Sequence, residues 1–150
     1  MSLYSVVVPV YNSEHTLTEL YTRLEKVFRE TVQEPFELIL VDDGSKDRSY
    51  QIMEELRQKD PRVKIIQMAR NFGQHPALLC GFSHAEGDFI ITMDDDLQHP
   101  PEEIPKLINT IRERDDVDVI IASYEGRCDA SVEDARTQVN AIIPVVVPDF

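Results

Sequence analysis

Three consecutive carboxylates, Asp94-Asp95-Asp96, follow directly on a short apolar run at residues 89–93. Such a run fits a buried strand, and adjacent carboxylates about 4 Å apart repel one another by roughly 1 kcal/mol even in water. A hard divalent cation with oxygen ligands would neutralise them. Acidic triplets also form solvated loops or cap helices, and a Pro-Pro pair that predicts a helix start follows here. The triplet alone leaves both interpretations open.

Other polar groups follow three further apolar runs. These groups are Pro9-Val10-Tyr11-Asn12, Asp42-Asp43-Gly44-Ser45 and Arg70-Asn71-Phe72-Gly73. Ligands of open parallel sheets bind outside the carboxyl ends of the strands, so we expect these groups along one edge. Asp42 could accept a hydrogen bond from a base or a ribose, or belong to a turn and helix cap. Arg70 could contact a diphosphate or neutralise the carboxylates.

Strands alternate with helices along the predicted chain. Apolar runs predict strands at 5–10, 36–41, 63–68, 89–93 and 117–122. Helical spacing predicts helices over about 14–30 (with Ser13 as N-cap), from the Asp42-Ser45 turn to about residue 59, through 77–85 and over 101–114. This alternation predicts right-handed crossovers onto a mostly parallel sheet, which is a doubly wound α/β fold.

The last part of the chain carries a weaker pattern. We expect one nucleotide-binding domain over 1–123 and an irregular or helical tail over 124–150. Residues 131–143 could form a helix, and the apolar run at 144–150 has no following element to complete a unit. An uncovered sheet edge and this apolar tail would favour a homo-oligomer.

Composition limits the classes of partner. The 150 residues suit one domain, and 28 acidic against 15 basic residues give a net charge of -13. This charge argues against nucleic acid as a partner and against an anionic membrane surface. Cys80 and Cys128 lack the spacing of metal ligands and fit reduced cytosolic thiols. With no basic n-region before the first strand and no membrane-spanning apolar run, we expect a soluble, cytoplasmic chain.

The motif series resembles that of the family 2 glycosyltransferases, which have the GT-A fold. The resemblance is carried by Pro9-Val10-Tyr11-Asn12, Val41-Asp42-Asp43-Gly44-Ser45 with Asp47, and the stretch from Met93 to Glu102. Arg70-Asn71-Phe72-Gly73-Gln74 and Asp96-Leu97-Gln98-His99-Pro100-Pro101 are most similar to the branch that moves sugars onto polyprenyl phosphates. The resemblance covers about residues 3–123. It implies inverting transfer from a nucleotide-diphosphate sugar with Mg2+ or Mn2+, to a polyprenyl-phosphate or glycan acceptor. It also implies a place at the inner face of the membrane.

The resemblance assigns roles by position. It implies nucleotide binding by Pro9, Tyr11, Glu14, Asp42 and Asp95, metal binding by Asp94 and Asp96, and diphosphate or sugar contacts by Arg70 and Gln98. Asp95 could alternatively cap the helix that the Pro-Pro pair opens. Family members continue past this point with their acceptor-binding part, so the catalytic acceptor-side residues stay unknown. The alternative interpretation is a non-catalytic nucleotide-sugar-binding fragment or a module that needs a partner.

Overall fold

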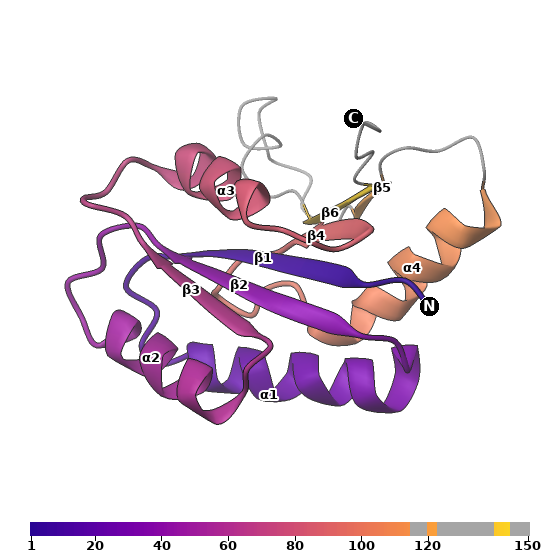
Figure 1. Cartoon of the computed structure of the whole chain (residues 1–150), viewed down its shortest axis with the longest axis horizontal. Coiled ribbons are helices and arrows are strands. Elements are labelled where there is room, and N and C mark those ends of the chain that lie inside the picture. Colours follow the sequence, from indigo (N-terminus) through magenta and orange to yellow (C-terminus); the bar gives the residue numbers. More distant parts are fainter. Residues whose placement is uncertain (115–119, 123–139, 145–150) are drawn as a thin grey trace.

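A computed structural model of the chain describes residues 1–114, 120–122 and 140–144 (Figure 1). They form a six-stranded sheet in the order β3-β2-β1-β4-β6-β5. The strands are β1 (Tyr4–Val10), β2 (Phe36–Asp42), β3 (Val63–Gln67), β4 (Phe89–Thr92), β5 (Ile120–Ala122) and β6 (Asn140–Pro144). β1 to β4 pair in parallel, whereas β6 runs antiparallel to both β4 and β5. The predicted doubly wound, mostly parallel sheet is therefore confirmed.

Two hydrophobic clusters cover the two faces of this sheet. The helices are α1 (Leu17–Val27), continued by a π-helix at Phe28–Val32, then α2 (Ser49–Lys59), α3 (Gln74–Ser83) and α4 (Ile104–Glu113). Alternating residues of β1 divide between the faces: Val6 and Val8 pack with α1, α2 and α4, and Val7 packs with α3. In Figure 1, α1 and α2 lie on one face of the sheet and α3 on the other.

The packing of α3 depends on a glycine. A Cβ built on Gly81 would lie 2.4 Å from Val7 Cγ1 and 3.2 Å from Val41 Cγ2. Such distances are shorter than van der Waals contact, so a larger residue would push α3 away from β1 and β2. Because α3 begins directly after the loop that follows β3, its close packing also sets the position of that loop.

Most of the predicted elements are present, and two predictions need correction. The first helix begins at Leu17 rather than near Glu14, since the single proton of the Ser13 hydroxyl is directed to Asp95 and Tyr11 O instead of capping. The helix predicted to run to Ile143 is wrong at 140–143, which belong to β6. Short apolar runs such as Ala141-Ile142-Ile143 cannot be assigned by periodicity, and this one completes the sheet between β4 and β5.

The remaining predictions near the C-terminus fall mainly outside the described residues. Of the strand predicted at 117–122, residues 120–122 form β5, and 117–119 lie outside the described ranges. The same holds for 131–139 and 145–150, and for the expected boundary at residue 123, which stays a prediction. In the described ranges, the helices are too short or too polar to cross a bilayer.

Candidate functional site

The parallel register brings four strand ends to one edge of the sheet. Val10 pairs with Asp42, Asp42 pairs with Gln67, and Val7 pairs with Thr92. The residues after these positions therefore surround a common space, as expected for the ligand-binding edge of an open parallel sheet. Two adjoining hollows occupy this edge, and Tyr11 and Asn71 line both of them.

The first, which we call the acidic hollow, has a volume of about 450 Å3. Its lining residues come from all four strand ends and are Pro9, Val10, Tyr11, Asp43, Asn71, Gly73, Gln74, Asp94, Asp95 and Asp96. The second, the Asp42 hollow, has a volume of about 620 Å3. It is lined by Tyr11, Asp42, Gly44, Ser45, Lys46, Gln67, Met68, Ala69, Arg70 and Asn71. Of the nine residues predicted for the site, seven thus line one hollow or the other.

Asp94 is a half-buried acid of the acidic hollow. Its Oδ1 accepts a hydrogen bond from the side-chain amide of Gln74, at 3.0 Å. Burial raises the pKa of Asp94, and the negative charge of Asp96 raises it further, against the opposing effects of His99 and Gln74. The carboxylate is therefore costly to keep ionised in the free chain, and a bound cation would relieve that cost.

Asp95 points to the turn between β1 and α1. Its Oδ2 accepts hydrogen bonds from the backbone N–H of Tyr11, at 3.0 Å, and from the hydroxyl of Ser13. Its carbonyl oxygen accepts from Thr16 Oγ1 at 2.5 Å. Burial nevertheless raises the pKa of Asp95. These contacts occupy the carboxylate with the turn and fix the backbone from which the Tyr11 side chain projects.

Asp96 is exposed at the rim of the acidic hollow. Its Oδ1 accepts the backbone N–H of Gln98 at 3.1 Å, in a turn where Leu97 has a φ of 61°. Gln98 itself is exposed and lines neither hollow. The turn thus orients Asp96 toward the hollow through Gln98's backbone, whereas the predicted side-chain role of Gln98 has no counterpart in the described contacts.

The Asp42 hollow combines one buried acidic side chain with two exposed basic side chains, Lys46 and Arg70. Asp42 is 2% exposed, and its Oδ1 accepts the backbone N–H of Ser45 at 3.2 Å. Arg70 is exposed and stacks over the Phe72 ring, with its guanidinium carbon 4.7 Å from the ring centroid. Tyr11, 46% exposed, offers an aromatic face where the two hollows meet. This hollow therefore offers a carboxylate acceptor, a cation and an aromatic surface.

Glu14 does not reach either hollow. Its Oε2 accepts the backbone N–H of Arg48 at 3.1 Å, just before α2, and its own N–H donates to Asp47 at 3.2 Å. The structure thus places Glu14 and Asp47 as links between the β1–α1 turn and the start of α2. The predicted contact between Glu14 and a nucleotide has no geometric support in this arrangement.

Asp43 was not singled out from the sequence, although it stands next to Asp42. It is 4% exposed, and its two oxygens accept the backbone N–H groups of Phe72 at 2.8 Å and Gly73 at 3.1 Å. Successive residues at a strand end point in opposite directions, so the Asp42-Asp43 pair could have indicated two separate roles. Asp43 holds the loop after β3, while Asp42 stays in its hollow.

Gly44 brings this loop into contact with the turn after β2. It has a φ of +76°, and a Cβ there would lie 2.6 Å from Asn71 N and 2.9 Å from Arg70 C. Any L side chain would be strained in that conformation and would collide with backbone. Gln74 comes at the end of this loop and hydrogen-bonds Asp94. It is another site residue that the sequence did not predict. Its place at the end of the Arg70–Gln74 motif was the available signal.

The acid set fits a cation that brings further oxygen ligands with it. Among the described residues, no group of three His, Cys, Asp or Glu side chains converges on one point. Mg2+ binds readily through one or two carboxylates together with waters and phosphate oxygens. Asp94 and Asp96 line the same hollow and interact electrostatically. Their arrangement therefore suits a cation that binds together with a diphosphate.

Comparisons with known proteins agree with this architecture. A model of glycosyl transferase family 2 matches residues 5–145, so the chain belongs to that family. It is 51% identical over 114 residues to an undecaprenyl-phosphate 4-deoxy-4-formamido-L-arabinose transferase of Proteus mirabilis, and 43% identical over 132 residues to one of Pseudomonas paraeruginosa. These alignments cover 75% and 87% of the chain but 35% and 38% of the relatives, so the chain spans little more than a third of their length.

Solved structures place the chain within the GT-A fold. The structure of Staphylococcus aureus TarS in complex with UDP-GlcNAc is similar with a TM-score of 0.66 and 32% identity, over 86% of this chain and 36% of that one. The mannosyltransferase PcManGT of Pyrobaculum calidifontis, in complex with GDP-Man and Mn2+, gives a TM-score of 0.71. It is 18% identical, over 85% of this chain and 37% of that one. The predicted family and fold are confirmed.

Proposed function

We propose that the chain is the donor-binding half of a metal-dependent, inverting glycosyltransferase that uses a nucleotide-diphosphate sugar. The observation that carries this proposal is the continuity of the two hollows, which share Tyr11 and Asn71. A nucleotide would place its base and ribose in the Asp42 hollow, against Asp42 and Tyr11. Its diphosphate and sugar would then extend into the acidic hollow. TarS, 32% identical, has been solved with UDP-GlcNAc, which supports this class of donor.

In this proposal, Asp94 and Asp96 hold Mg2+ or Mn2+ and Arg70 lies near the diphosphate. When bound, the cation supplies positive charge to the nucleoside diphosphate that leaves the anomeric carbon. The chain's own residues bind and orient the donor. Asp42 accepts a hydrogen bond, Tyr11 provides a stacking surface, and Asp95 fixes the Tyr11 backbone by accepting its N–H.

The proposed acceptor is a polyprenyl phosphate. This part of the proposal rests on the names of the undecaprenyl-phosphate transferases that are 43–51% identical to the chain. A phosphate acceptor is already ionised near neutral pH and needs a general base less than a sugar hydroxyl does. Such an acceptor would bring the protein to the inner face of the membrane. The reaction as a whole is proposed for the longer proteins to which this donor half corresponds.

The test is calorimetric titration of UDP, GDP and their sugars into the chain, with Mn2+ and again with chelator. We expect one nucleotide series to bind measurably in chelator and much more tightly with Mn2+. Asp94→Asn and Asp96→Asn should each weaken the binding measured with Mn2+ by about 100-fold or more, because losing a direct ligand exceeds the 10- to 100-fold cost of losing a supporting group.

Asp88→Asn is the matched control, since Asp88 is exposed at the other end of β4 and its carboxylate accepts only the Leu3 backbone N–H among the described hydrogen bonds. It should bind like the wild type. Binding that ignores both metal and the two substitutions would overturn the metal-dependent donor site. Binding with the expected profile, but without transfer to a short-chain polyprenyl phosphate, would favour a binding fragment over a complete enzyme.

A further inference from the structure

The loop 71–74 runs between the two hollows: Asn71 lines both, and Gly73 and Gln74 line the acidic hollow. Its start packs against Gly44, in the turn that carries Asp42, and its end enters α3. Asp43 holds the middle of the loop through the N–H groups of Phe72 and Gly73. Gly73 has a φ of +100°, a conformation in which glycine is unstrained. The loop is therefore held at several points before it reaches Gln74.

Gln74 then contacts the acid that the proposed function assigns to the cation. Its Nε2 donates to Asp94 Oδ1 at 3.0 Å, and both residues line the acidic hollow. An ionised carboxylate can accept hydrogen bonds but cannot donate them, so the amide nitrogen of Gln74 faces it. One of the two oxygens of Asp94 is thus held by a group of the protein, which limits rotation of the carboxylate.

The chemical type of this partner matters. A Lys or Arg at the same point would orient Asp94 equally well but would neutralise the charge that attracts a cation. A Glu would add repulsion to a site that is already lined by four carboxylates, those of Asp43, Asp94, Asp95 and Asp96. Glutamine orients the carboxylate and leaves its charge in place. Groups that hydrogen-bond metal ligands typically affect metal affinity by about 10- to 100-fold.

We propose that Gln74 is a positioning residue for the cation: its side-chain amide orients Asp94, and Asp43 sets the position of Gln74 through the loop 71–74. This inference rests on the proposed function, because it takes Asp94 as a ligand of the cation. Gln74 itself does not contact the sugar donor. Asp42 and Tyr11 bind the nucleotide, whereas Asp43 and Gln74 prepare the metal site.

The experiment compares the wild type with Gln74→Met, which keeps the length of the side chain and removes the hydrogen bond. Mn2+ binding is followed by electron paramagnetic resonance with UDP, and with GDP, present. Nucleotide binding is measured separately in chelator. We expect the apparent Kd for Mn2+ to rise by about 10- to 100-fold, with nucleotide affinity in chelator and the thermal midpoint close to those of the wild type. Gln58→Met, at an exposed glutamine of α2, is the matched control and should change nothing.

A second variant tests the role of the loop. Asp43→Asn leaves one backbone N–H of the loop facing an amide nitrogen, so the loop should shift and weaken Mn2+ binding on its own. Adding Gln74→Met should then cost much less than it does in the wild type, since residues of one hydrogen-bonded network are not additive. Full additivity of the two substitutions would overturn the proposed link between Asp43 and Gln74.

The outcomes for Gln74→Met are distinct. A Kd for Mn2+ within twofold of the wild type would overturn the positioning role and leave the donor site intact. An equal loss of Mn2+ binding, nucleotide binding in chelator and thermal stability would also overturn it, in favour of a general structural role. If the wild type bound no Mn2+ with either nucleotide, while binding a nucleotide in chelator, the metal-dependent site itself would fail together with this inference.

Discussion

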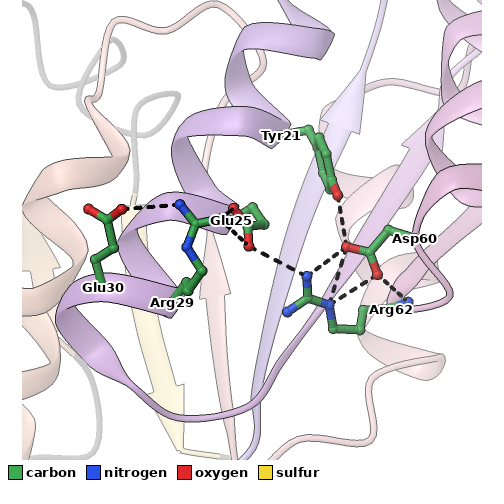
Figure 2. A network of polar contacts seen from close by, with 6 residues as sticks. All are labelled: Tyr21, Glu25, Arg29, Glu30, Asp60 and Arg62. Carbon is green, nitrogen blue, oxygen red and sulfur yellow. Dashed lines mark hydrogen bonds and ion pairs between the residues drawn. The ribbon is translucent and has the colours of Figure 1, made fainter.

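Two groups of acidic side chains at different places in this fold have opposite electrostatic surroundings. One group is Asp94, Asp95 and Asp96 at the carboxyl ends of the strands. The other surrounds Asp60, between α2 and the start of β3, and we call it the arginine-paired cluster (Figure 2). It consists of Tyr21, Glu25, Arg29, Glu30, Asp60 and Arg62. The carboxylates of the arginine-paired cluster contact arginines. Those of Asp94, Asp95 and Asp96 contact mainly neutral hydrogen-bond donors.

Both carboxylate oxygens of Asp60 accept hydrogen bonds. Its carboxylate accepts the Tyr21 hydroxyl at 2.8 Å, the Arg62 backbone N–H at 2.9 Å and the Arg62 guanidinium at 2.8 Å. These contacts, the Arg62 side chain foremost, lower the pKa of Asp60 to about 2. In the acidic hollow, burial raises the pKa of both Asp94 and Asp95. The ionised carboxylate of Asp60 thus stabilises the fold, whereas those of Asp94 and Asp95 destabilise it. A bound cation would be attracted by the two destabilising charges.

The largest effect on folding is expected from Asp60→Ala. This substitution leaves the buried hydroxyl of Tyr21 without its acceptor and removes the nearer carboxylate partner of Arg62, at 2.8 Å, leaving Glu25 at 4.0 Å. We expect the free energy of unfolding to fall by about 2–4 kcal/mol, measured by urea denaturation at pH 7. Asp88→Ala, at an exposed acid, serves as the control and should cost about 0.5 kcal/mol. A loss below about 1 kcal/mol for Asp60→Ala would remove the basis of the contrast.

The pH dependence of stability should reveal the same cluster. The pKa of Asp60 is about 2 in the folded chain, below its ordinary value of 3.8. Its contribution is therefore fully present above the unfolded pKa and is lost as the pH falls from about 5 toward 2. We expect this loss to be on the order of 1–2 kcal/mol, because exposed Arg62 leaves part of the pair screened by solvent.

Urea titrations of the wild type and Asp60→Asn across this pH range would check the prediction. Asn cannot titrate, so the difference in unfolding free energy between the two proteins should shrink as the pH falls. A difference that stays constant down to about pH 2.5 would show that the stabilisation does not come from the ionised carboxylate.

The sequence predicted the site to the extent that it depends on strand ends. Four apolar runs, each followed by polar residues, suffice to bring Tyr11, Asp42, Arg70 and Asp94 to one edge, because parallel strands share their direction. The runs also identified four parallel strands. β6 was missed because its apolar run is compatible with either a strand or a helix, and only pairing with β4 and β5 decides between them.

The hydrogen-bond partners of individual side chains could not be predicted from the sequence. Asp95 contacts Ser13, 82 positions away, and Asp43 contacts Phe72, 29 positions away. Such contacts depend on the path of each turn after its strand ends. Glu14 shows the same limitation, since it precedes α1 and its Oε2 accepts the backbone N–H of Arg48, 34 positions away. Motif position therefore identified the edge but not the role of every residue there.

A smaller effect, of opposite sign, is expected from Asp94→Asn in the free chain. Because the folded pKa of Asp94 is raised, stability is lost as the pH rises from the ordinary value of 3.8 to the folded pKa, and the asparagine variant avoids this cost. We expect the free energy of unfolding at pH 7 to increase by about 0.5–1 kcal/mol, while metal-dependent nucleotide binding is lost. Thermal unfolding in chelator, beside calorimetry with Mn2+, measures the two changes. A destabilised variant would mean that Asp94 contributes to folding as Asp60 does.

The smallest effect is expected from Arg29→Ala, at the outer end of the arginine-paired cluster. Arg29 lies 2.9 Å from Glu25 and 3.1 Å from Glu30, distances as short as those around Asp60, but its side chain is 59% exposed. Exposed ion pairs lose most of their attraction to solvent and to side-chain entropy, so the urea midpoint should not change measurably. A loss comparable to that of Asp60→Ala would instead mean that the whole network acts cooperatively. Exposure would then not limit what an ion pair of this cluster contributes, and Arg29 as well as Arg62 would account for the contrast with the acidic hollow.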